Sequence, residues 1–181
     1  MDEDEEWGVL GLSLGGMIAM QWCANYPEDF KKLVVINTSA GGLGGGFVRL
    51  TAEAVHTLAR AVMIRNPRMK ESLVCHLISN LRANDEGVIA AYEKIAIESP
   101  IPSSIAASQL TAAARFKAPS SINTSMLVLS ADNDRLCPPE FSDLIATKYG
   151  AEHLTHPTAG HDLPLDDPSW VIEQVFQFAQ K

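Results

Sequence analysis

A serine flanked by two glycines at the spacing typical of a nucleophile lies near the start of the chain, within Gly11-Leu12-Ser13-Leu14-Gly15. An apolar run precedes these residues, Gly16 follows them, and a helical pattern comes next. In this context the G-x-S-x-G spacing indicates a sharp, strained turn between a buried strand and a helix, with the serine hydroxyl exposed. Glycines suit such a turn because a Cβ on the flanking positions would collide with the neighbouring strand or helix. A glycine-rich turn in another kind of α/β protein is the alternative interpretation.

A serine hydroxyl is a weak nucleophile, so the chain must also supply a general base and an acid that orients the base. In open parallel sheets such groups lie just past the carboxyl ends of strands. His161 is the one histidine in a glycine-containing loop that follows an expected strand and precedes the last helix. The other four lie in helical segments or in or beside a strand: His56, His76, His153 and His156. His161 is therefore the predicted base.

Two aspartates follow the strand expected at residues 126–130, at positions Asp132 and Asp134. Either carboxylate could orient the histidine. Aspartates in such loops also form Asx turns or cap helices without any role in catalysis. The residues alone do not decide between the two.

Apolar runs and helical periodicity predict the elements that position these residues. Four strands are expected, at residues 7–12, 33–37, 126–130 and 152–156. Helices are expected at residues 14–26, 52–65, 67–81, 87–98, 103–116, 138–148 and 168–180. Their order predicts an α/β fold, a parallel sheet flanked by helices, with an all-helical insertion. The predicted division is a core of residues 1–40 and 118–181 and an insertion of residues 41–117.

Two of the expected helices carry many apolar residues. In helix 14–26 these residues, Ile18 and Trp22 among them, cover much of the surface, which predicts burial on more than one side. The last helix is expected to bury Val171, Ile172, Val175, Phe176 and Ala179. The run from Gly41 to Gly46 is interpreted as a hinge or loop, because it lacks the G-x-G-x-x-G spacing of a dinucleotide site.

The composition argues against several functional classes. The net charge is −8, and all five residues from 2 to 6 are acidic, so the body of the chain is only mildly acidic and lacks the clustered Lys and Arg of a nucleic-acid surface. No apolar run approaches the ~20 residues of a membrane span, and the acidic start does not fit a secretory signal. The cysteines are odd in number and widely spaced, at Cys23, Cys75 and Cys137, which predicts buried, reduced thiols in a cytoplasmic protein.

The candidates run in the order serine, aspartate, histidine, which is the triad order of α/β-hydrolases. The chain resembles this superfamily, in particular its esterases and C–C hydrolases with a helical cap. The matching stretches are Gly11–Met17, Tyr26-Pro27 leading to residues 33–37, residues 126–129, Asp134–Pro139 and Ala159-Gly160-His161. In the family the acid lies just before a short stretch that leads to proline. That position is Asp134 here, with Asp132 as the second choice.

The resemblance implies roles for the matched residues. Ser13 would attack a carbonyl, His161 would take its proton, Asp134 would hold the imidazole, and the Leu14 N–H would bind the oxyanion. A small-molecule acyl substrate is implied, with no metal or organic cofactor. A serine at this position argues against haloalkane dehalogenase and epoxide hydrolase chemistry, which uses a carboxylate there. Hydrolysis and acyl transfer to another acceptor both remain open.

The chain departs from the family at its start, where six residues precede strand 7–12 and the family has several strands. The loop that supplies a second oxyanion donor has no counterpart, and loss of one donor typically costs about 100- to 1,000-fold in rate. Weak or no activity of the isolated chain is therefore expected. The edge of strand 7–12 would also lie open. A fragment of a longer enzyme is the favoured explanation, and cover by a second copy, by another chain or by residues 2–6 are the others.

The predicted function is a serine hydrolase that cleaves a carboxylic ester or a related acyl bond. The alternative is a non-catalytic module that binds a partner through its cap or its open sheet edge. The apolar residues of the insertion fit either a cap over an apolar pocket or a plain helical core. The identity of the substrate stays open.

Overall fold

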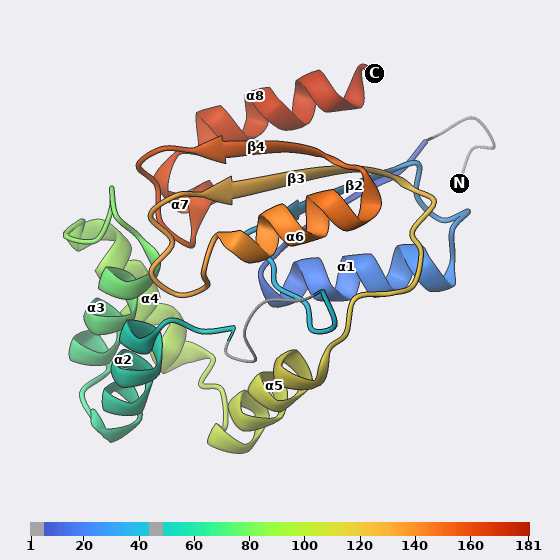
Figure 1. Cartoon of the computed structure of the whole chain (residues 1–181). Helices are drawn as coiled ribbons and strands as arrows, with labels where there is room; N and C mark the ends of the chain where they lie inside the picture. Colours follow the sequence, from blue (N-terminus) through green and yellow to red (C-terminus); the bar gives the residue numbers. More distant parts are fainter. Residues whose placement is uncertain (1–5, 44–48) are drawn as a thin grey trace.

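A parallel sheet forms the centre of the molecule (Figure 1). The computed structural model describes residues 6–43 and 49–181, and within these residues the sheet has the order β1-β2-β3-β4. Its strands are β1 (Gly8–Leu12), β2 (Lys32–Ile36), β3 (Ser125–Ala131) and β4 (Glu152–His156). The predicted parallel α/β fold is confirmed, and each expected strand is present within two residues of its predicted bounds.

The parallel pairing brings the ends of all four strands to one edge of the sheet. Leu12 pairs with Ile36, Ile36 pairs with Leu129, and Ala131 pairs with His156. The loops that follow these strands therefore lie next to one another. β2 and β3 are apolar and nearly continuously buried, as expected for the central strands of a sheet that is covered on both faces.

Helices cover the two faces of the sheet. α1 (Leu14–Asn25) and α6 (Glu140–Tyr149) pack on one face, where Met20 and Ile145 join the buried cluster. α8 (Pro168–Ala179) covers the other face, and the short α7 (Leu163–Asp166) precedes it. α7 has only four residues, too few for a helical period in the sequence, and it was not predicted.

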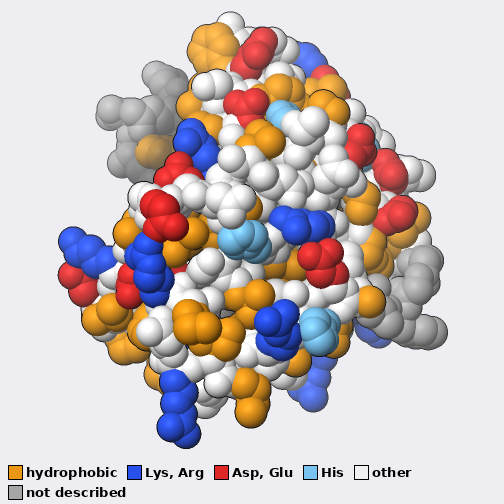
Figure 2. All heavy atoms as spheres, turned by 90° about the vertical axis from the view of Figure 1, so that its left-hand side faces the viewer, with side chains coloured by type: hydrophobic (Ala, Val, Ile, Leu, Met, Phe, Trp, Pro, Cys, Tyr) orange, Lys and Arg blue, Asp and Glu red, His pale blue; other side chains and the backbone are white. Residues whose placement is uncertain are grey.

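The segment between β2 and β3 is a helical insert made of α2 (Ala52–Met63), α3 (Pro67–Ile78), α4 (Glu86–Glu98) and α5 (Ser103–Arg115). It lies beside the carboxyl edge of the sheet (Figure 1). Side-chain oxygens of Thr51, Asn66 and Asp85 accept backbone N–H groups and cap the first three of these helices. Figure 2 shows the face of the molecule that carries the insert, with acidic and basic side chains interspersed. None of the helices in the described ranges combines the length and the apolar character that a membrane crossing requires.

Two helices bury less than their composition predicted. Ile18 and Trp22 of α1 are 58% and 45% exposed, although Met17, Met20 and Cys23 on the same helix are buried. In α8, Ile172, Phe176 and Ala179 are also exposed, and Val171 and Phe178 form the buried face. Each helix therefore packs through one face only, because nothing within the described residues covers its other side. Residues 2–5 and the second half of the glycine run, Gly44–Gly46, lie outside the described residues.

The glycines around the Ser13 turn differ in what they permit. A Cβ on Gly11 would overlap the backbone carbonyl group of Gly15, and a Cβ on Gly16 would overlap the hydroxyl of Thr38. The predicted steric requirement is therefore correct at these two positions. At Gly15 it is wrong, since a Cβ there would meet no atom within 4 Å.

This difference makes a paired test of the turn. We expect Gly11→Ala to destabilise the fold by about 1–3 kcal/mol or more, because the overlap is with backbone that cannot move alone. Gly15→Ala should be neutral or stabilise by up to about 1 kcal/mol, since alanine is favoured over glycine in a helix. Urea unfolding of both variants gives the two free energies. Equal losses would contradict the steric account.

Candidate active site

Ser13 forms the junction between β1 and α1. Its backbone has φ 53° and ψ −116°, a sparsely populated conformation that costs on the order of 1–3 kcal/mol. The end of β2 holds the turn in place: the Ser13 N–H donates to the Ile36 carbonyl at 2.8 Å, and the Thr38 hydroxyl donates to the Ser13 carbonyl at 3.2 Å. The strained turn that the sequence predicted is present, and Ser13 is half-buried at the carboxyl edge of the sheet.

Leu14 is the first residue of α1 and directly follows Ser13. The first backbone N–H groups of a helix have no acceptor within the helix, and the helix dipole makes this end favourable for negative charge. The Leu14 N–H therefore suits an anionic oxygen that forms next to the serine. Its assignment as an oxyanion donor stays a prediction.

Asp134 and His161 form a buried pair. Oδ2 of Asp134 lies 2.7 Å from Nδ1 of His161, and the two side chains are 1% and 6% exposed. The second carboxylate oxygen accepts the N–H groups of Leu136 at 2.8 Å and Cys137 at 2.9 Å. Because these bonds fix the carboxylate, it can hold the proton on Nδ1 and leave Nε2 as the basic nitrogen.

The other aspartate of the loop has a different environment. Asp132 is exposed, and its backbone N–H donates to the His156 carbonyl at 3.0 Å. Asp134 is thus the acid that contacts the predicted base. This agrees with the family pattern, which favoured Asp134 over Asp132.

Asn37 is a site residue that sequence reasoning missed. It follows β2, is buried, and has a left-handed φ of 45°. Its side-chain N–H2 group donates to the carbonyls of His161 at 2.7 Å and Gly160 at 3.3 Å, and its Oδ1 accepts the Ala131 N–H at 2.9 Å. One side chain therefore joins the ends of β2 and β3 to the histidine loop. A polar residue after an apolar strand was the only signal, and such residues are common.

The serine turn and the histidine loop are held by neighbouring residues at the carboxyl end of β2. Ile36 binds the backbone of Ser13, and Asn37 binds the backbone of His161. Between these two described residues, no hydrogen bond joins the Ser13 hydroxyl to the His161 ring. In enzymes without substrate, catalytic hydrogen bonds are often long and tighten only when the substrate binds.

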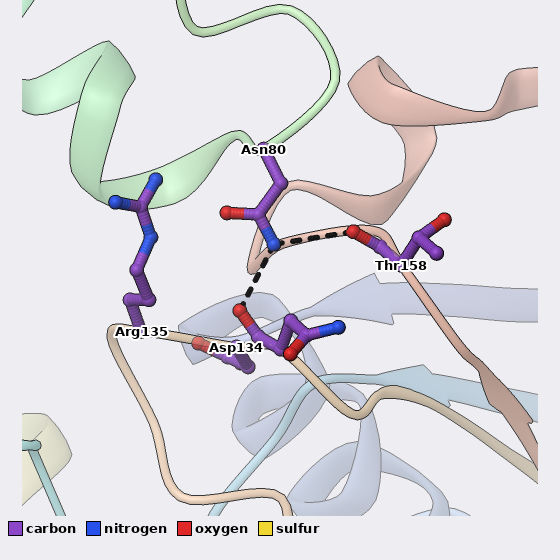
Figure 3. Close-up of a pocket in the computed structure, with 5 residues that line it drawn as sticks. Asn80, Asp134, Arg135 and Thr158 are labelled. Atoms are coloured by element: carbon purple, nitrogen blue, oxygen red, sulfur yellow. Dashed lines mark hydrogen bonds between the residues drawn. The ribbon is translucent and has the colours of Figure 1, made fainter.

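An open cleft of about 540 Å³ borders the acid loop (Figure 3). It is lined by Asn80, Asn133, Asp134, Arg135 and Thr158. The Asn80 amide spans it, donating to the carbonyls of Asn133 at 3.0 Å and Thr158 at 3.3 Å. Ser13 and His161 are not among the lining residues, so this polar cleft is not the place where Ser13 would meet an acyl group.

A second serine–histidine–aspartate set runs from β3 through β4 to the exposed Asp143 of α6. Ser130 Oγ is 2.8 Å from Nε2 of His153, whose Nδ1 is 3.0 Å from Asp143. Ser130 is fully buried within β3 and lacks a strained turn and a helix N-terminus. This set is a structural hydrogen-bond network rather than a nucleophile with its base.

Cys137 is the thiol closest in sequence to Asp134. Burial, and next the negative charge of Asp134, raise the pKa of Cys137 to about 12. It therefore remains a protonated thiol, which is a poor nucleophile. Within residues 6–43 and 49–181, the His, Cys, Asp and Glu side chains form no group of three that could hold a metal ion.

The parallel sheet, the strained serine turn and the buried Asp134–His161 pair define an α/β-hydrolase fold. The sequence matches the family model of serine aminopeptidases, S33, over residues 2–167. The chain belongs to this family. A search of functionally curated proteins found no match to it.

Solved structures share the fold at low sequence identity. A hydrolase from Pseudomonas aeruginosa superposes with a TM-score of 0.74 at 21% identity, covering 97% of this chain and 65% of that one. The 2-hydroxy-6-oxo-6-phenylhexa-2,4-dienoate hydrolase of Rhodococcus sp. strain RHA1 gives 0.71 at 18% identity, with 98% and 65% covered. An esterase from Thermogutta terrifontis gives 0.69 at 21% identity, with 97% and 65% covered. The chain thus spans about two thirds of the length of these structures.

The role of Asn37 can be separated from its backbone conformation. We expect Asn37→Ala to lower the free energy of unfolding by about 3 kcal/mol, because three hydrogen bonds are lost and alanine is strained at positive φ. Asn37→Gly removes the same hydrogen bonds but relieves the strain, so its loss should be smaller by about 1 kcal/mol. Chemical denaturation measures both. Losses below about 0.5 kcal/mol would show that the bonds to the histidine loop contribute little.

Proposed function

We propose that this chain carries the catalytic residues of a serine hydrolase that cleaves a carboxylic ester or a related acyl bond. Ser13 is the nucleophile, His161 the general base and Asp134 the acid that orients it. The observation that carries the proposal is the buried 2.7 Å Asp134–His161 pair, anchored on the same strand end as the strained Ser13 turn.

The reaction would proceed through an acyl-enzyme. His161 takes the Ser13 proton through Nε2 as Oγ attacks the substrate carbonyl, and the Leu14 N–H stabilises the negative oxygen. His161 then protonates the leaving group. In the second half it activates water, which releases the acid and restores Ser13. The Asp134 carboxylate stabilises the imidazolium that forms in each half.

The rate of this chain alone should be low. Among the described residues, the Leu14 N–H is the oxyanion donor that we identify, and loss of one of two donors typically lowers the rate about 100- to 1,000-fold. The substrate class is a small acyl compound, in keeping with the esterase and the dienoate hydrolase that share the fold. Water as the acyl acceptor is proposed over another nucleophile on the same grounds.

The cellular setting belongs to the same proposal. Cys23, Cys75 and Cys137 are all buried and free. Free thiols are typical of reducing compartments. We therefore propose a cytoplasmic location.

Replacing Ser13 tests the assignment directly. We expect Ser13→Ala to abolish hydrolysis of p-nitrophenyl acetate and covalent labelling by a fluorophosphonate, because both require the activated hydroxyl. Ser130→Ala is the matched control, since Ser130 also contacts a histidine but is buried, and it should keep both signals. Labelling is followed by mass spectrometry of the modified peptide.

Two results would contradict the proposal. Turnover or labelling that survives in Ser13→Ala would exclude Ser13 as the nucleophile. A wild-type chain that is never labelled at Ser13 would favour the alternative, a non-catalytic module that binds through its insert or its sheet edge. A rate equal to that of full-length esterases would contradict only the expected low activity of this chain.

The open edge of β1 supports a second proposal, a homodimer. β1 has the outer position in the described sheet, and Leu10 in its middle is 48% exposed, with Trp7 exposed beside it. An apolar edge strand with unpaired backbone groups is a template for pairing with another chain. In a symmetric homodimer, the β1 strands of the two copies would pair with each other.

A charge on the edge should prevent this pairing. We expect size-exclusion chromatography with light scattering to give about twice the 19.6 kDa chain mass for the wild type. Leu10→Lys should give the mass of a single chain, because a lysine on an edge opposes strand pairing. A wild type that is monomeric at high concentration would exclude the dimer.

A further inference from the structure

Asp166 is a buried carboxylate that the proposed reaction does not use. It lies at the end of α7 and is 6% exposed. Both of its oxygens are fully engaged by hydrogen-bond donors. Oδ1 accepts the Ser79 hydroxyl and the N–H groups of Leu81 (3.1 Å) and Arg82 (3.3 Å), and Oδ2 accepts those of Asn80 (2.9 Å) and Gly160 (2.7 Å).

These donors come from two separate parts of the chain. Residues 79–82 form the turn that follows α3 in the helical insert. Gly160 belongs to the core and directly precedes His161. A single carboxylate therefore holds the turn of the insert against the loop that carries the candidate base.

Further contacts run along the same junction. The Asp162 N–H donates to the Ile78 carbonyl at 2.7 Å. A Cβ on Gly160 would lie 2.9 Å from that carbonyl oxygen, so the two backbones are in direct contact. Tyr92 of α4 donates its hydroxyl to Asp162 at 3.3 Å; burial, and next the charge of Asp162, raise the pKa of Tyr92 to about 12, which keeps this donor protonated.

The carboxylate of Asp166 has the chemistry that this junction needs. Burial disfavours its charge, but the bonds from Ser79, Asn80, Gly160 and Leu81 outweigh burial and lower the pKa of Asp166. At neutral pH it is therefore an acceptor at both oxygens. An asparagine of the same shape would place an N–H2 group against backbone N–H donors, and at least one of these would lose its partner.

We propose that Asp166 is a positioning residue that fixes His161 by locking the histidine loop to the helical insert. Asn37 holds this loop from the sheet side, and Asp166 holds it from the insert side. The placement of the base then depends on the insert being docked. The kinetic consequence rests on the proposed function, whereas the structural coupling does not.

Hydrogen exchange of Asp166→Asn tests the coupling. The reporter is the Asp162 N–H, which bonds to Ile78 across the junction and has no bond to Asp166. We expect its exchange to rise about 10- to 100-fold, together with that of residues 80–82, because a charged hydrogen-bond network has been broken. Asp167→Asn is the matched control: Asp167 caps α8 through the Trp170 N–H, and asparagine caps equally well, so both regions should stay protected.

The effect on kcat relative to KM distinguishes a positioning role from a purely structural one. In Asp166→Asn we expect kcat for p-nitrophenyl acetate to fall about 10- to 100-fold with KM changed less than about threefold, because the base is misplaced while binding persists. Asp166→Glu keeps both acceptor oxygens and should restore part of kcat. Asp167→Asn should match the wild type.

The outcomes separate the two proposals. If exchange rises only at residues 80–82 and Asp162 stays protected, Asp166 merely orders the turn that follows α3 and the coupling is overturned. If Asp166→Asn fails to fold, Ser79→Ala removes one donor from the insert side and should still raise exchange at Asp162. If Ser13→Ala keeps the activity while the exchange coupling is found, the proposed function fails and the positioning role of Asp166 stands for the loop alone.

Discussion

The carboxyl end of β2 carries the contacts on which the site depends. The Ile36 carbonyl holds the strained Ser13 turn, and the Asn37 side chain holds the histidine loop and the end of β3. A parallel sheet makes this arrangement available, because all of its strands end at one edge. β2 is the suitable strand, since it is buried and paired on both sides. A shift in its register would displace the nucleophile and the base together.

Neutral donors, mostly backbone N–H groups, rather than cations hold the two buried carboxylates on either side of the histidine loop. Asp134 is fixed by Leu136 and Cys137, and Asp166 by the insert turn and Gly160. This choice has a consequence for the chemistry. A nearby cation would compete with His161 for the charge of Asp134, whereas neutral N–H donors leave that charge available to the imidazolium. Arg135, the next residue, instead donates to carbonyls of the insert at His76 and Ser79.

Local patterns predicted much of this molecule, and long-range contacts limited the rest. Strand bounds, helix bounds and the positions of Ser13 and His161 follow from apolar runs, caps and loops, all of which are local in sequence. The choice of Asp134 over Asp132 required the family pattern. Asn37 acts across 124 residues and Asp166 across 87, and neither contact has a local signal. The exposed faces of α1 and α8 were missed because an apolar surface in a sequence does not show what covers it.

The attachment of the helical insert explains why it should matter to the base. Its two ends meet where the Gly41 N–H donates to Phe116 and the Ala118 N–H donates to Gly41, at 3.1 and 2.9 Å. The chain thus leaves the core and returns to it at the same place. The helices of the insert contribute no residue to the two buried apolar clusters of the sheet, and α5 buries none of its residues. Polar contacts made by Arg135 and Asp166 join the insert to the loops that carry Asp134 and His161.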